Sequence, residues 1–91
     1  MGRLENRILK LNDDLERLRR QRELIAEELR FHQHLNDDAQ RDAAVSESPL
    51  DRSDARATAS DVVRFERSLS DVDDRLDRLA AKRDKLLERL T

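Results

Sequence analysis

Two heptad repeats of apolar residues, separated by a short segment with Ser and Pro, constrain this chain more than any other feature. In each half, apolar side chains recur at alternating steps of three and four residues, the spacing that lines one face of an α-helix with a hydrophobic seam. The first series is Leu4, Ile8, Leu11, Leu15, Leu18, Ile25 and Leu29, and the second is Val62, Phe65, Leu69, Val72, Leu76, Leu79, Leu86 and Leu90. The repeats predict two long helices.

The boundary between the helices is indicated by Ser48-Pro49-Leu50-Asp51. Ser suits the N-cap, Pro the first helical position and an acid the third position after the cap. We therefore expect a helix over about residues 3–45, a turn over about 46–48 and a helix over about 49–90. A competing start is Thr58 with Asp61, which would leave residues 46–57 as a loop.

Equal helices joined by a short turn must run antiparallel. Folding the chain about residue 47 pairs positions whose numbers sum to 94, for example Ile8 with Leu86, Leu15 with Leu79 and Leu29 with Phe65. The expected fold is all-α: an antiparallel coiled-coil hairpin that forms a single domain over residues 1–91. Alanines in the seam near the turn, such as Ala43, predict that this end is the less stable one.

Composition agrees with helices and bears on the partners. Charged residues make up 44% of the chain and aromatic residues 2%, with one Gly and one Pro, a balance that disfavours β-sheet. The net charge is −2, with acids and bases interspersed, so we expect no direct nucleic-acid binding. The chain has no cysteine, no leader-like segment and no long apolar run, so a cytoplasmic protein that does not cross a membrane is expected.

Polar residues also occupy seam positions, namely Arg22, His32 and Asn36 in the first series and Arg83 in the second. The register places Arg22 opposite Val72, Arg83 opposite Leu11, and His32 opposite Val62. Charged side chains in a seam cost stability and penalise shifted registers, so these residues are interpreted as register determinants. The long arginine stems can carry their guanidinium groups to acids at the seam edge.

A second apolar stripe lies outside the seam at Leu24, Phe31 and Leu35. A two-helix hairpin cannot cover both its seam and this stripe, so we expect a partner to bind there. The expected partner is a second copy of the chain, giving a four-helix bundle, or another protein.

No catalytic, metal or cofactor site is expected. The sequence has no Gly-rich phosphate loop and no nucleophile beside a base. His34 and Asp38, one turn apart, provide too few ligands for a metal site. The chain is therefore predicted not to be an enzyme.

The segment Ser48-Pro49-Leu50-Asp51-Arg52, followed by a charged heptad helix, resembles the apex of the coiled-coil hairpins of DksA/TraR-type transcription factors, an architecture that Gre factors share. The resemblance implies a hairpin that enters the secondary channel of RNA polymerase and presents an acidic tip, here Asp51 with Asp54 nearby. The cysteine zinc motif of the DksA/TraR group and a second globular domain like that of Gre factors are both absent.

A further spacing is similar to the cyclic-di-GMP signature of RsiG-type anti-sigma factors. It consists of Glu23, Glu27, Arg30, His34 and Asp38, where the signature has Ser and Gln in place of Glu27 and His34. That similarity implies ligand-dependent sigma-factor binding. From the sequence we thus expect a non-enzymatic interaction or regulatory module, with a transcription regulator that binds RNA polymerase or a sigma factor as the alternative.

Overall fold

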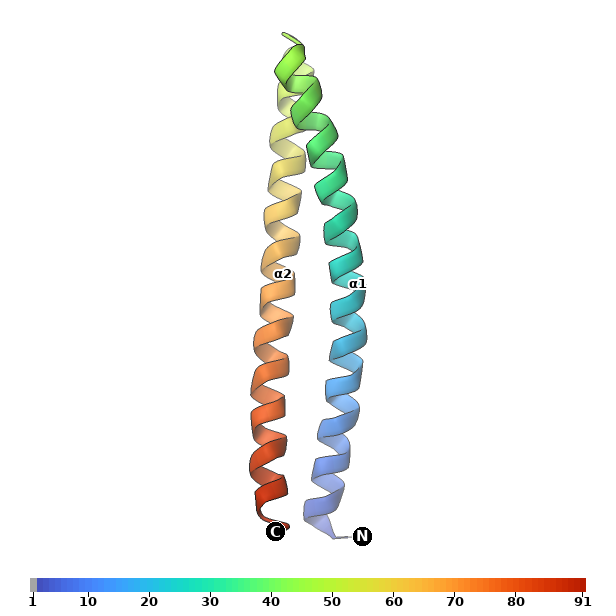
Figure 1. Ribbon diagram of the computed structural model, residues 1–91, viewed down its shortest axis with the longest axis vertical. Helices are drawn as coiled ribbons and strands as arrows, with labels where there is room; N and C mark the ends of the chain where they lie inside the picture. The colour runs from blue at the N-terminus through green and yellow to red at the C-terminus, as the bar shows by residue number, and fades with distance from the viewer. Residues whose placement is uncertain (1) are drawn as a thin grey trace. The chain divides into compact units, whose positions relative to one another are not determined.

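The computed structural model describes residues 2–91 and consists of two α-helices. Helix α1 spans Arg3–Val45 and helix α2 spans Pro49–Glu88, with residues 46–48 between them (Figure 1). The all-α class and the two long helices predicted from the heptad repeats are confirmed. Beyond Glu88, the amides of the last three residues bond to carbonyls three residues earlier, so the α-helix ends before Leu90. Leu90, which the repeat placed in the seam, is 47% exposed.

The start of α2 is at Pro49, and the competing start at Thr58 is not observed. Residues 49–57 are helical, and the seam side chain in that segment, Ala55, is 5% exposed. The Thr58 hydroxyl, which would have capped a later helix, lies 3.0 Å from the Asp54 carbonyl oxygen. At the observed start, the Ser48 N–H donates to Ser46 Oγ over 3.0 Å. The hydroxyl of Ser46 therefore accepts the hydrogen bond of the N-cap amide, which in a complete capping box goes to the acidic side chain three residues later, here Asp51.

The chain divides into two compact units, which we call the terminal unit (residues 2–23 and 70–91) and the turn unit (residues 24–69). In each unit a segment of α1 lies beside an antiparallel segment of α2 (Figure 1). The terminal unit has a well-buried seam, in which Leu15 is 1% exposed and Val72 4%. Ile8, Leu11 and Leu86 form a buried cluster, against which Leu4 and Leu79 pack. Ile8 and Leu86 are partners in the register that sums to 94.

The seam of the turn unit is thinner and more polar. Ala55 is its one fully buried apolar residue among the described residues. Ile25, Leu29, Val62, Phe65 and Leu69 are only half-buried, and His32, Asn36 and Thr58 occupy other seam positions. Because apolar burial supplies most of the stability of such a helix pair, the turn unit is expected to be the weaker of the two.

Candidate functional site

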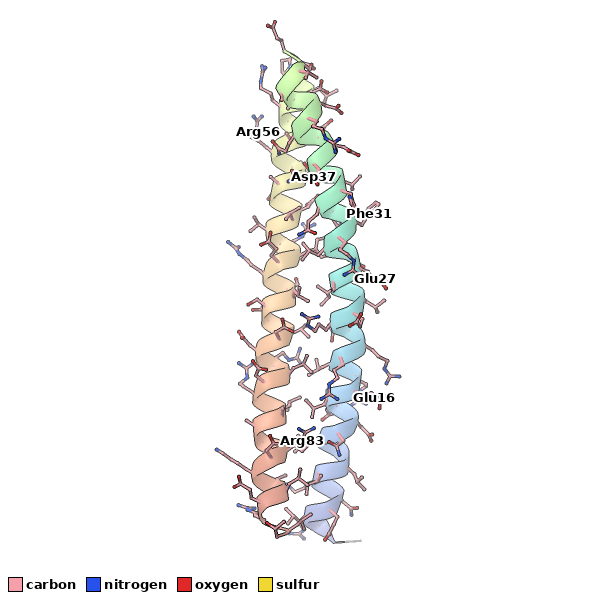
Figure 2. The ribbon with its side chains drawn as sticks, in the orientation of Figure 1. Glu16, Glu27, Phe31, Asp37, Arg56 and Arg83 are labelled. Carbon is pink, nitrogen blue, oxygen red and sulfur yellow. The ribbon has the colours of Figure 1, made fainter. Side chains whose placement is uncertain are left out.

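The largest exposed apolar side chains of α1 in the turn unit lie on one flank of the helix. Leu24 is 62% exposed, Phe31 60% and Leu35 40%. In heptad notation, with the seam at positions a and d, Leu24 and Phe31 occupy position c and Leu35 position g, which are neighbouring columns on one side of the helix. We call these three residues the apolar flank. Figure 2 shows Phe31 on α1, on the side that faces away from α2.

Two exposed apolar residues near the turn were missed in the sequence. Val45 is 88% exposed at the end of α1, and Leu50 is 68% exposed in the first turn of α2. Both occupy position c of their heptads, the column that contains Leu24 and Phe31 in α1. Marking every large apolar residue outside positions a and d would have found them.

Carboxylates border the apolar flank. Glu28 lies between Leu24 and Phe31 at position g, Asp38 and Asp42 extend the c and g columns beyond Leu35, and Glu27 is at the neighbouring position f. All are exposed. Asp38 accepts a hydrogen bond from Arg41 over 3.1 Å, and the other carboxylates have no ion pair among the described residues. The flank therefore combines apolar side chains with a negative rim.

The opposite side of the turn unit has a different chemistry. An open hollow of about 460 Å³ there is lined mainly by alanines, among them Ala43 and Ala55, and by Arg52 and Arg56. The Arg52 guanidinium donates to the Glu47 carbonyl oxygen over 3.1 Å. Arg52 and Arg56 occupy heptad positions e and b, the columns opposite c and g. Arg52 and Arg56 thus lie on the side of this unit opposite the carboxylates that border the apolar flank.

Aromatic contacts join the apolar flank to the seam. The His32 ring stacks on Phe65 of α2, with ring centroids 4.4 Å apart and planes at 19°. Phe31 meets the same ring edge-on at 5.5 Å and 77°. The register placed Val62 opposite His32, but the long side chains meet one turn away. Because Phe31 contacts a seam residue, part of the flank is held in position by the packing between the helices.

A polar layer crosses the seam one turn closer to the chain reversal. Asn36 Oδ1 accepts hydrogen bonds from Gln40 Nε2 over 2.9 Å and from the Thr58 hydroxyl over 3.0 Å. Gln40 Nε2 also donates to the Ala55 carbonyl oxygen over 2.9 Å. Asn36 and Thr58 are partners in the register that sums to 94, which was signal enough to predict this pair, although only Asn36 was noted in the seam.

The two seam arginines behave differently. Arg22 reaches across the seam edge, and its Nε donates to Asp73 of α2 over 2.5 Å. The hydrogen bond and the charge of Asp73 raise the pKa of the Arg22 guanidinium. Arg83 instead donates from Nε and Nη2 to its neighbour Asp84, over 3.2 and 3.1 Å, and lies between the helices in Figure 2. A register role for these residues and for His32 stays a prediction.

The acidic tip residues differ in exposure. Asp51 lies at a seam position in the first turn of α2 and is half-buried, whereas Asp54 is exposed. The series related to the cyclic-di-GMP signature, Glu23, Glu27, Arg30, His34 and Asp38, lies along α1 with every member exposed. Of the two tip acids, Asp54 is therefore the more accessible to a partner.

Among residues 2–91, no group of three or more His, Asp or Glu side chains is arranged to hold a metal ion. Neither helix, over the same residues, combines the length and apolar character that crossing a bilayer requires. No protein-family model, curated protein or solved structure matches this chain.

Proposed function

We propose that this chain is a protein–protein interaction module that binds its partner through the apolar flank. The observation that carries the proposal is the exposure of Leu24, Phe31 and Leu35 on one side of a single helix. Large apolar side chains that are exposed together on one face of a small protein mark an interaction site more specifically than singly scattered ones do. The proposed role requires no catalytic chemistry from the chain itself.

The shape of the surface favours a helical partner. Leu24 and Leu35 are eleven residues apart on α1, which at 1.5 Å per residue corresponds to about 16 Å, or three helical turns. A helix that crosses this ridge can place its own apolar residues between Leu24, Phe31 and Leu35, as helices do in bundles. A second copy of the chain, giving a four-helix bundle, and a helix of a different protein both meet this requirement.

The test compares Phe31→Asp with Val63→Asp. Val63 is 46% exposed in the same unit and occupies heptad position b of α2, on the side away from the flank. Both variants should keep the wild-type helical circular dichroism, because both side chains are exposed. Sedimentation equilibrium at micromolar concentrations and affinity purification should show an association that Phe31→Asp abolishes and Val63→Asp retains. A wild-type monomer whose bound proteins are the same as those of Phe31→Asp would contradict the proposal.

A second candidate is a transcription regulator that binds RNA polymerase or a sigma factor. The observation that favours it is the exposed Asp54 beside the half-buried Asp51 at the start of α2, next to the chain reversal. This candidate predicts that Asp54→Asn lowers binding to purified RNA polymerase or a sigma factor without changing helicity. No binding of the wild-type chain to either protein would rule it out.

A further inference from the structure

We propose that the occupant of the apolar flank is a positively charged amphipathic helix of another protein. This inference rests on the proposed function and names the chemistry of the partner. It follows from the side chains that surround Leu24, Phe31 and Leu35 in the turn unit.

The rim charges select for a basic partner. In α1 of the turn unit, positions c and g contain Leu24, Phe31, Leu35 and Val45 together with Glu28, Asp38 and Asp42, and no Lys or Arg. Any helix that packs on the flank must approach these carboxylates. Lys or Arg beside its apolar stripe would pair with them, whereas acidic residues would meet like charge at short range.

On the same side of the turn unit, α2 offers little positive charge to balance the carboxylates of the rim. Arg64 is the one basic residue at positions c and g of α2 in this unit, but its guanidinium donates to Asp61 over 3.0 Å. Asp54 at position g adds a further exposed carboxylate. Asp38 is already paired with Arg41, so the counter-charge for Glu27, Glu28 and Asp42, which have no ion pair among the described residues, must come from the partner.

These charges also disfavour a second copy as the occupant. If the flank packs on itself in antiparallel fashion, Leu24 meets Leu35 of the second copy, but Phe31 then meets Glu28. The carboxylates of Glu27 and Glu28 in both copies crowd into the centre of the contact, and positions c and g of α1 in this unit bring no Lys or Arg from either copy. Like charges at an interface reduce both the association rate and the affinity.

The proposal is tested with the full chain and three synthetic peptides of about 18 residues. The first carries a Leu stripe with three- and four-residue spacing and Lys at the flanking positions. The second has the same Leu stripe with Glu in place of Lys. The third has the composition of the first with its Leu residues scattered around the helix. Binding is measured by isothermal titration calorimetry at low and moderate NaCl concentration.

We expect the Lys peptide to bind at least tenfold more tightly than either of the others at low salt. The advantage should shrink as salt screens the rim charges. Phe31→Ser, which leaves the charge unchanged, should abolish the binding, and Val63→Ser should leave it intact. Glu28→Gln combined with Asp42→Asn should weaken the Lys peptide three- to tenfold and leave the Glu peptide unaffected or slightly improved.

Each contrary result identifies what fails. Equal binding of the Lys and Glu peptides, with both lost in Phe31→Ser, overturns the charge inference and leaves the flank as an interaction surface. Equal binding of the scattered peptide overturns the amphipathic helix. A wild-type dimer that Phe31→Ser dissociates makes the second copy the occupant. If neither peptide binding nor self-association responds to Phe31→Ser, the proposed function falls together with the inference.

Discussion

Replacing Leu15 by Ala, with Leu24→Ala as its matched control, tests whether burial is distributed as the structure has it. Both residues are leucines on α1, and both changes lead to the best helix former, so helix propensity contributes little to the difference. Leu15 is 1% exposed in the seam of the terminal unit, and Leu24 is 62% exposed on the apolar flank. The two variants therefore differ in the packing that each removes.

The expected magnitudes follow from the burial. Leu→Ala at buried sites costs about 2 to 5 kcal/mol, through lost transfer free energy and a residual cavity. A two-helix seam is one side chain deep, so its neighbours and solvent can close over the gap. We therefore expect Leu15→Ala to lower the free energy of unfolding by about 2 to 3 kcal/mol. For Leu24→Ala, which removes mostly solvated surface, we expect a change of less than about 0.5 kcal/mol.

The assay is urea denaturation followed by helical circular dichroism, with hydrogen exchange to locate the effect. In Leu15→Ala the protection should fall for the amides of the terminal unit, around residues 8–18 and 72–86. In the wild-type chain, the turn unit should already exchange faster than the terminal unit because its seam is thinner and more polar. These measurements are made at a protein concentration at which sedimentation shows a monomer.

One result would refute this reasoning directly. If Leu24→Ala destabilises the monomer as much as Leu15→Ala does, Leu24 is covered in solution by another part of the chain. The apolar flank would then not be free to bind a partner. Faster exchange in the terminal unit than in the turn unit would likewise contradict the distribution of burial.

Two further predictions concern polar residues in the seam. Asn36→Leu is expected to raise the free energy of unfolding, measured by urea denaturation, by about 0.5 to 1.5 kcal/mol, because apolar burial increases while Gln40 and Thr58 keep backbone carbonyl partners. A lower free energy of unfolding would mean that the polar layer is net stabilising. Arg22→Gln is expected to lower the free energy of unfolding equally at about pH 6 and about pH 10. A raised arginine pKa contributes stability that is complete below the unfolded-state pKa and is lost only as the pH rises through the folded-state pKa. A destabilisation that is smaller at pH 10 than at pH 6 would contradict this.

The sequence by itself determined the helices and their register. The steps of three and four residues place one apolar face on each helix. Ser48-Pro49 supplies the start signal of the second helix, because a Pro at the first helical position loses no intrahelical hydrogen bond. Since two helices joined by three residues must run antiparallel, the pairing of Ile8 with Leu86 and of Asn36 with Thr58 follows from arithmetic along the chain.

The burial of each seam residue, and the choice between competing hydrogen-bond acceptors, were decided only by the tertiary structure. Heptad positions alone do not distinguish the fully buried Leu15 from the half-buried Leu29 or the exposed Leu90, because burial depends on the size of the facing side chains and on where the helix ends. The hydroxyl of Ser46, not the carboxylate of Asp51, accepts the hydrogen bond of the Ser48 amide, because several nearby acceptors compete for one donor.

The apolar flank was determined partly by the sequence and partly by the tertiary structure. Leu24, Phe31 and Leu35 were identified from spacing, because residues outside positions a and d cannot enter a two-helix seam. Their exposure, the contact of Phe31 with the stacked His32 ring, and the separation of the carboxylate rim from Arg52 and Arg56 required the packed helices. The physical reason is that periodicity fixes the direction of a side chain on its own helix, whereas solvent exposure depends on what the other helix leaves uncovered.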